Sequence, residues 1–199
     1  MGRSIPRMIF ASAIVACTFV APSCSVLRSN LQVVEPGQFY RSGQMGGVEL
    51  DAATHWLGIK TVVNLRGESP DELWYRREIA ACARNGVLHH DLAWSMRALP
   101  TPESLLQLID WIESGPRPML IHCQAGVHRA AVASAVYRLL RGDSVDDARE
   151  EFGLFFNDAP IGELLDLYDG SKPFGQWAIE DYPAIYAADT SAISPARTR

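Results

Sequence analysis

Short apolar runs alternate with longer amphipathic stretches through most of this chain. The apolar runs predict strands at residues 31–34, 38–42, 60–65, 87–92 and 119–121. The amphipathic stretches predict helices at residues 48–57, 73–85, 101–114, 130–140, 144–152 and 162–168. Because strands and helices alternate, the pattern favours an α/β fold with a mostly parallel central sheet flanked by helices on both sides.

Local signals sharpen several of these boundaries. The pair Pro36-Gly37 predicts a turn, so the first two strands should form a hairpin. Two of the helices should end at Gly58 and Gly86, and another should begin with Pro102 in its first turn.

The length and composition of the chain allow one sizeable core. With 199 residues, 48% of them hydrophobic, we expect a single domain at residues 31–188, a linker at 24–30 before it and a disordered polar tail at 189–199. The formal net charge of −5 argues against nucleic acid as a partner. The oligomeric state is not defined by these patterns.

Candidate chemistry concentrates between the last predicted strand and the helix that follows it. Residues 121–130 place Cys123 and Arg129 six positions apart, with Gly126 between them. A loop at this point turns at a helix N-terminus, where free N–H groups and the positive end of the dipole attract an anion. A thiol there ionises readily beside a cation, and an arginine fork binds two phosphate oxygens. The residues predicted to bind phosphate are Gln124, Ala125, Gly126, Val127, His128 and Arg129.

The arrangement His-Cys-x5-Arg at residues 122–129 resembles the signature of the cysteine-dependent protein tyrosine and dual-specificity phosphatases. Residues 39–44, 61–68 and 101–103 are similar to the bacterial dual-specificity-like group that is related to plant and fungal atypical phosphatases. The resemblance covers residues 31–170. It implies a dual-specificity phosphatase-like fold and a phosphatase that needs no metal or other cofactor.

The resemblance also implies a mechanism for the loop. The thiolate of Cys123 attacks phosphorus, Arg129 and the loop N–H groups hold the phosphate oxygens, and water then hydrolyses a cysteinyl-phosphate. His122, beside the nucleophile, is expected to support the geometry of the loop. The predicted activity is hydrolysis of phosphomonoesters, either in phosphotyrosine or phosphoserine/threonine proteins or in a small phosphorylated molecule.

A general acid for the leaving oxygen is less well defined by the sequence. Asp91 precedes the cysteine by 32 residues, which is the spacing usual in this family. It falls within a predicted strand, however, whereas the family acid usually lies in the loop after that strand, and residues 94–99 contain no carboxylate. Glu68, Asp71 and His128 are the alternatives to Asp91 as general acid.

The chain departs from the family pattern directly after the loop. Ala130 and Ala131 stand where the family has serine or threonine and then glycine. The missing hydroxyl normally helps the cysteine sulfur leave during hydrolysis of the phosphoenzyme, so we expect a slow second step. A phosphate-binding module that has lost turnover is the alternative. A rhodanese-like sulfurtransferase is disfavoured, because the loop has the arginine that phosphate binding requires.

An inositol phosphate or pyrophosphate is the alternative to a phosphoprotein as substrate. Plant and fungal members of the resembling group act on such compounds, whose many charges require several extra cations. The cations expected near the loop are His128, Arg129, Arg66, Arg97 and Arg41. Arg41 and Arg97 are explained at least as well as solvated surface charges.

The first 23 residues differ in kind from the rest of the chain. A basic start with Arg3 and Arg7 precedes an apolar run at residues 8–20, which is short for a membrane span and typical of a secretory signal. Lipid attachment at Cys24 is favoured over Cys17, with plain cleavage or an uncleaved anchor as alternatives. We therefore predict an exported protein, either periplasmic or attached to the membrane as a lipoprotein.

Export creates a tension with the predicted chemistry. An oxidising compartment favours disulfides, whereas this mechanism needs a free thiolate. Cys82 lies inside a predicted helix, where packing in the core is its expected role, although sequence spacing leaves a disulfide with Cys123 open.

Overall fold

The computed structural model describes residues 29–193. The predicted secretory segment and the candidate lipid-attachment residues Cys17 and Cys24 lie outside the described residues, as does the end of the chain from residue 194. Export and lipid attachment therefore stay predictions. Among the helices that are described, none is both long enough and apolar enough to cross a bilayer.

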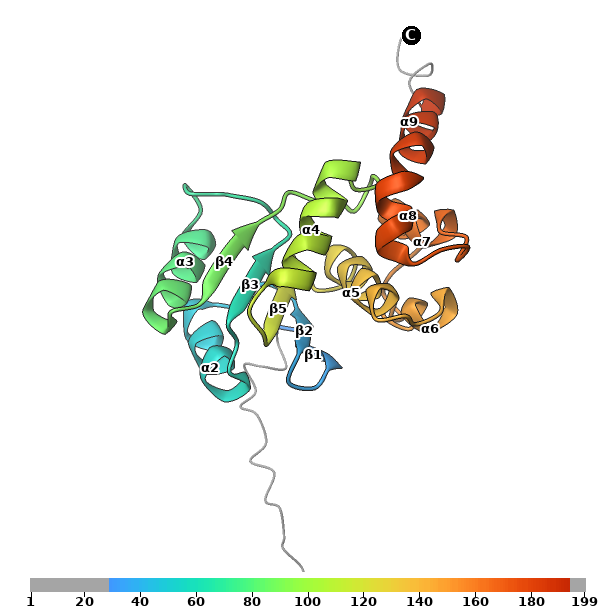
Figure 1. Ribbon diagram of the computed structural model, residues 1–199. Helices are drawn as coiled ribbons and strands as arrows, with labels where there is room; N and C mark the ends of the chain where they lie inside the picture. Colours follow the sequence, from blue (N-terminus) through green and yellow to red (C-terminus); the bar gives the residue numbers. More distant parts are fainter. Residues whose placement is uncertain (1–28, 194–199) are drawn as a thin grey trace, which may run out of the picture.

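Within residues 29–193, a five-stranded sheet forms the centre of the domain (Figure 1). Its strands are β1 (Gln32–Glu35), β2 (Phe39–Ser42), β3 (Thr61–Asn64), β4 (Leu88–Asp91) and β5 (Met119–His122). They lie in the order β1-β2-β5-β3-β4; β1 runs antiparallel to β2, and the other neighbours are parallel. The predicted mostly parallel sheet and its opening hairpin are confirmed. The carboxyl ends of β3, β4 and β5 meet at one edge of the sheet.

Helices cover both faces of this sheet. They are α2 (Gly47–Leu57) and α3 (Leu73–Asn85) on one face, and α4 (Pro102–Ser114) and α5 (Arg129–Leu140) on the other (Figure 1). Successive strand residues alternate between two hydrophobic clusters. Val62 and Leu120 belong to the cluster beneath α2 and α3, whereas Val63 and Ile121 belong to the cluster beneath α4 and α5.

Local signals position these helices as the sequence predicts. The Thr101 hydroxyl accepts a hydrogen bond from Ser104 N, and Pro102 occupies the first turn of α4. Gly58 and Gly86 follow α2 and α3 in the left-handed conformation, with φ of 66° and 62°. These caps fix where each helix ends and therefore where the next strand enters the sheet.

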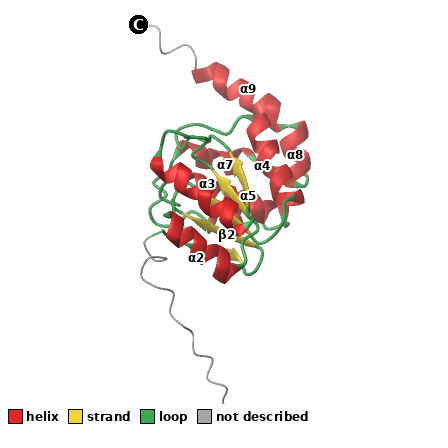
Figure 2. Cartoon of the chain, turned by 90° about the vertical axis from the view of Figure 1, so that its left-hand side faces the viewer, coloured by secondary structure: helices red, strands yellow, loops and turns green. Residues whose placement is uncertain are grey.

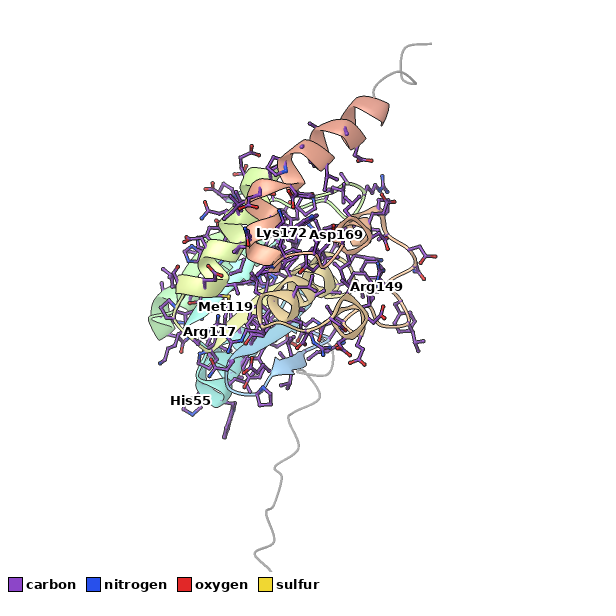
Figure 3. All side chains as sticks on the ribbon, turned by 45° about the vertical axis from the view of Figure 1, so that its right-hand side comes forward. His55, Arg117, Met119, Arg149, Asp169 and Lys172 are labelled. Atoms are coloured by element: carbon purple, nitrogen blue, oxygen red, sulfur yellow. The ribbon has the colours of Figure 1, made fainter. Side chains whose placement is uncertain are left out.

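The C-terminal part of the domain is divided into more helices than the sequence predicts. They are α6 (Val145–Arg149), the 3₁₀ turn η1 (Pro160–Glu163), α7 (Leu164–Leu167), α8 (Phe174–Glu180) and α9 (Tyr182–Ile193). The helix predicted at 144–152 ends early, and the helix predicted at 162–168 is shared between η1 and α7. Arg149, labelled in Figure 3, pairs with Asp166 and ties α6 to α7.

The pattern of apolar positions misses α8 and α9. Their buried contacts are aromatic: the rings of Phe174, Trp177 and Tyr182 pack in series, and the Tyr182 hydroxyl donates to Pro100 O at 2.6 Å. This anchor lets α9 continue to Ile193, so the prediction of a disordered tail from residue 189 is wrong up to that residue. Figures 1 and 2 show the far end of α9 projecting from the body of the domain.

Candidate active site

The nucleophile loop begins where β5 ends and finishes where α5 begins. Cys123 directly follows β5 and Arg129 is the first residue of α5, so each element extends one residue closer to the loop than the sequence predicts. Because β5 lies between β2 and β3, the loop emerges between the ends of two neighbouring strands. Cys123 is only 3% exposed, so the loop shields its thiol from bulk water.

Three successive carbonyls of the loop accept hydrogen bonds from the segment that contains β2. The pairs are Gln44 N to Gln124 O (3.0 Å), Asn30 Nδ2 to Ala125 O (3.1 Å) and Arg41 Nη1 to Gly126 O (3.2 Å). Because a trans peptide is planar, each N–H points away from the carbonyl of the residue before it. The N–H groups of residues 125–127 therefore point to the inside of the loop. Gly126 N–H accordingly donates to Cys123 Sγ at 3.3 Å.

Gly126 is a position where another residue would not fit. Its φ is +72°, and a Cβ atom would lie 2.6 Å from Gly43 N and 2.7 Å from Ser42 C. The missing side chain lets the loop lie directly against the end of β2. This close contact keeps the carbonyls on the outside of the loop and the N–H groups on the inside.

Arg129 connects the loop to the two strands on its other side. Its Nη1 donates to Leu65 O at 3.0 Å and to Trp94 O at 3.2 Å, two carbonyls that follow β3 and β4. Both contacts use the same nitrogen, so within the described residues Nε and Nη2 stay available for an anion. This is the placement expected of an arginine that closes a phosphate cradle.

A second guanidinium, that of Arg66, lies beside the cradle. It stacks on the Trp74 ring, 3.5 Å from the ring centre, and its Nη1 donates to Gln44 Oε1 at 2.8 Å. Burial lowers the pKa of Arg66, and the nearby positive charge of Arg129 lowers it further, while two nearby carboxylates and, to a smaller extent, the charge of Cys123 act in the opposite direction. Arg66 is thus the second cation that the structure brings to the nucleophile.

Arg41 and Arg97 have other environments. Arg41 is 4% exposed, and its Nε lies 3.1 Å from Glu151 Oε2 in a buried ion pair. Burial lowers the pKa of Arg41, and Glu151 and Cys123 oppose that effect. Arg41 is therefore neither a solvated surface charge nor free for substrate, because it supports the loop from outside. Arg97 is exposed and borders a separate cavity with Glu163 and Asp189.

Asp91 is the last residue of β4, so it lies on a strand as the sequence predicts. Its Oδ1 accepts a hydrogen bond from Asn64 Nδ2 at 2.7 Å, and its Oδ2 accepts one from the Tyr75 hydroxyl at 2.6 Å. Burial and the hydrogen bond to Asp91 raise the pKa of Tyr75, which keeps that hydroxyl a donor. Both oxygens of the candidate acid are therefore engaged by internal donors.

The other candidate acids lie on two loops, the loop after β3 and the nucleophile loop. Glu68 and Asp71 are exposed on the loop after β3. His128 is half-buried at the start of α5, where its ring lies 5.5 Å from the ring of Phe156. The structure leaves the choice of general acid as a prediction.

Sequence reasoning missed one buried residue of the site, Glu78 on α3. It is 2% exposed and lies 3.1 Å from Nε2 of His122, the residue before the nucleophile. A signal was present in the sequence, because Glu78 shares the buried face of α3 with Tyr75, Ala81 and Cys82. A carboxylate on the buried, apolar face of a helix requires a hydrogen-bonding or charged partner.

Residues 22–160, more than half of the chain, match the family described as "DSP-PTPase phosphatase fused to NAD+ Kinase". The chain belongs to this DSP-PTPase family. The resemblance stated from the nucleophile loop is thereby confirmed, and the protein is a phosphatase of the DSP/PTP type. No curated protein matches the chain.

Several solved structures have a fold similar to that of this chain, and three of them show the degree of similarity. The core catalytic domain of the PP-IP phosphatase Siw14 from S. cerevisiae, in complex with citrate, has a TM-score of 0.59 and 19% identity, and the match covers 81% of this chain and 93% of that one. P. aeruginosa TpbA has a TM-score of 0.56 and 22% identity, with 80% and 91% covered. Tk-PTP in its active form has a TM-score of 0.53 and 19% identity, with 78% and 97% covered. These matches confirm the dual-specificity phosphatase-like fold.

In the phosphatase, both cysteines among the described residues are free thiols. Cys82 is 2% exposed in the cluster beneath α2 and α3, and Cys123 belongs to the cluster on the other face of the sheet. Burial raises the pKa of the Cys82 thiol to about 12, and the negative charges of Glu78, Asp51 and Asp91 contribute. The expected packing role of Cys82 is confirmed, and the disulfide left open by the spacing is not formed.

The departure at Ala130 lies inside the phosphatase core. Ala130 and Ala131 are fully buried in the first turn of α5, immediately after Arg129. Neither side chain can supply a hydroxyl to the sulfur of Cys123. The hydroxyl that this chain lacks would therefore lie next to the cradle.

Proposed function

We propose that this protein hydrolyses phosphomonoesters of phosphotyrosine or phosphoserine/threonine proteins through a cysteinyl-phosphate on Cys123. One observation carries the proposal: the loop carbonyls bond outward and the Gly126 N–H donates to the sulfur, so the N–H groups of residues 125–127 point to the inside of the loop. A phosphate in that position meets backbone donors and the open side of Arg129.

The chemistry proceeds in two steps. The Cys123 thiolate attacks phosphorus, a sulfur–phosphorus bond forms, and the bond from phosphorus to the ester oxygen breaks. The leaving oxygen takes a proton from a general acid or, when it is a good leaving group, departs as an anion. Water then attacks the phosphorus, inorganic phosphate is released and the sulfur returns to the thiolate.

Asp91 is the general acid that we propose for the first step. It lies at the carboxyl end of β4, the same edge of the sheet from which the nucleophile loop emerges. To donate a proton, its carboxyl group must exchange its contact with Tyr75 or Asn64 for the leaving oxygen. Because this exchange is required, proton delivery is less preorganised than phosphate binding.

The charges around the cradle support a substrate with one phosphate group at the site. Among the described residues, the guanidinium groups at the cradle are those of Arg129 and Arg66, whereas Arg41 is engaged by Glu151. An inositol pyrophosphate, the class of compound named in the description of Siw14 as a PP-IP phosphatase, would bring more charge than two guanidinium groups balance. A P. aeruginosa TpbA structure in complex with pTyr has a similar fold, with a TM-score of 0.55 and 21% identity.

A phosphate-binding module with little turnover is the second candidate function. Ala130 favours it, because the hydroxyl that assists breakdown of the phosphoenzyme is absent next to the cradle. A pure binding module has no use for a cysteine at the bottom of the loop, which supports the enzyme instead.

Cys123→Ser tests the proposed function. The purified protein is assayed under reducing conditions with p-nitrophenyl phosphate, a phosphotyrosine peptide and inositol hexakisphosphate. We expect phosphate release from the first two substrates, and its complete loss in Cys123→Ser, because a hydroxyl keeps the shape of the thiol but not its nucleophilicity. Inhibition by vanadate in the wild type and phosphate binding in the variant serve as controls for the cradle. Release by Cys123→Ser near the wild-type rate would refute the covalent mechanism.

A further inference from the structure

Glu78 makes contacts that the mechanism above does not use. Its Oε1 lies 3.1 Å from His122 Nε2 and 2.8 Å from His89 Nε2, and its Oε2 accepts a hydrogen bond from Gln44 Nε2. Burial alone would raise the pKa of Glu78, but the charge of His122 and the hydrogen bonds of its partners hold the pKa well below its usual range. Glu78 is therefore a buried carboxylate anion at neutral pH.

His122 presents both of its ring nitrogens to oxygen atoms. Nε2 faces Glu78, and Nδ1 lies 3.4 Å from the carbonyl oxygen of Cys123. Two acceptors are satisfied together only when both nitrogens carry protons, so this geometry fits an imidazolium. The ring is 3% exposed, and a buried cation requires the counter-charge that Glu78 supplies. The positive ring then lies beside the peptide of the nucleophile, where it favours the thiolate.

The second oxygen of Glu78 acts through Gln44. Because a carboxylate accepts only from the NH₂ end of an amide, the contact fixes which end of Gln44 faces away from Glu78. The free end, Oε1, accepts from Arg66 Nη1 at 2.8 Å. Trp74, which is also on α3, stacks under the same guanidinium. Helix α3 thus holds the second cation of the site from two directions.

We propose that Glu78 is a positioning residue: it holds His122 as a charged ring behind the nucleophile and, through Gln44, holds Arg66 beside the phosphate loop. The proposal rests on the covalent mechanism proposed above. It assigns two separable effects to one carboxylate. The contact with His122 sets how readily Cys123 ionises, and the contact with Gln44 sets how tightly the cradle holds phosphate.

Other titratable groups face this cluster and enter its pH dependence. They are Tyr75 and Cys82 of α3, His89 and Asp91 of β4, Arg66 after β3 and, next to Arg66, Arg129 of α5. Positioning and direct electrostatics predict opposite results for the removal of Glu78. A negative charge acting only at a distance would oppose the thiolate, so its removal would ease ionisation of Cys123. A charge acting through His122 supports the thiolate, so its removal hinders ionisation.

The test compares Glu78→Gln with Glu113→Gln, a matched change at an exposed position on α4. Alkylation of Cys123 by iodoacetamide is followed across pH in the full chain under reducing conditions, because only the thiolate reacts. Peptide mass spectrometry separates Cys123 from Cys82. We expect the midpoint of Glu78→Gln to lie at higher pH than that of the wild type, and Glu113→Gln to match the wild type. A midpoint that is unchanged or lower overturns the proposal.

The effect on Arg66 is measured as protection of Cys123 by inorganic phosphate, which does not depend on turnover. The phosphate concentration that halves the alkylation rate should rise about tenfold in Glu78→Gln and in Gln44→Leu, as expected for loss of one hydrogen bond to a charged group. Gln44→Leu should shift the pH midpoint less than Glu78→Gln does, because it leaves the contact between Glu78 and His122 in place. Wild-type protection in Gln44→Leu contradicts the role given to Gln44 and overturns the proposal.

Two further measurements distinguish a failure of this proposal from a folding defect of Glu78→Gln and from a failure of the covalent mechanism. If thermal melting shows that Glu78→Gln does not fold, Glu78→Asp keeps the charge but withdraws the carboxylate by one methylene, and it should shift the midpoint in the same direction. A wild-type midpoint in Glu78→Asp then overturns the proposal. If the wild-type protein releases no phosphate, the covalent mechanism fails, while the alkylation profiles still decide the role of Glu78.

Discussion

The half of the site that holds the anion and the half that would deliver the proton are built differently. On the side of β2 and β5, hydrogen bonds to the carbonyl oxygens of the loop fix it in place, and the Gly126 N–H already points at the sulfur of Cys123. On the side of β3 and β4, the carboxylate of Asp91 is occupied by Asn64 and Tyr75. Phosphate binding is therefore preorganised, whereas proton delivery requires a rearrangement or a leaving group that needs no acid.

The difference has a chemical reason. Backbone N–H groups at a helix N-terminus can be fixed before the substrate arrives, because their partner carbonyls bond on the outside of the loop. An acid must approach the leaving oxygen and then release its proton, so it cannot be fully satisfied by internal donors. Changes on the loop side should therefore affect every substrate, and changes on the acid side should affect some substrates more than others.

Arg129→Lys should have the largest effect on the preorganised half. A lysine has no planar fork, so it cannot keep both the contacts to the Leu65 and Trp94 carbonyls and the contacts to phosphate. We expect kcat/KM to fall by about 10²–10³-fold with aryl phosphates and phosphotyrosine alike. Arg84→Lys, an exposed position near the end of α3, is the matched control. Normal affinity of Arg129→Lys for vanadate would show that the cradle lies elsewhere.

Asp91→Asn should affect the two kinds of substrate differently. If Asp91 donates the proton, turnover of phosphotyrosine or alkyl phosphates should fall by about 10²–10⁴-fold and that of an activated aryl phosphate much less. Tyr75→Phe sharpens the test, because it removes the hydroxyl that occupies Asp91 Oδ2. That variant should retain phosphotyrosine turnover or increase it. Equal losses on both substrates in Asp91→Asn would mark Asp91 as structural.

Ala130→Ser should have the smallest effect, since it alters only breakdown of the phosphoenzyme. Restoring one hydrogen bond to the sulfur should raise the steady-state rate by about two- to tenfold. Wild-type protein mixed rapidly with an activated aryl phosphate should release a burst of one leaving group per site. Absence of a burst in the wild type, together with no gain in Ala130→Ser, would show that hydrolysis of the intermediate is not limiting.

The preorganised half of the site was the more predictable from sequence. Cys123, Gly126 and Arg129 lie within one short segment between a strand and a helix, so local patterns suffice to place them. The partners that hold the loop, Asn30 and Gln44, are distant in sequence, and only the fold brings them there. Their residue types carry no signal of that role.

The other features that sequence reasoning did not predict were missed for similar physical reasons. Glu78 was overlooked because its partners His122 and His89 come from two separate strands. The buried residues of α8, Phe174, Trp177 and Ala178, keep a helical spacing for only one turn, and the ring contacts then continue to Tyr182 in α9, so neither helix was predicted. The parallel sheet was predicted correctly, because the alternation of apolar runs and amphipathic stretches is a property of the local sequence.

The ion pair between Arg41 and Glu151 links the nucleophile loop to the order in which the chain is completed. Arg41 belongs to β2 and donates a hydrogen bond to Gly126 O. Its ion-pair partner Glu151 follows α6, much later in the chain. A chain that ends after α5 would contain every residue of the signature yet bury a guanidinium without its carboxylate. We therefore expect the minimal functional unit to extend past residue 151 and, during synthesis, the loop to attain its final shape only after that segment has emerged.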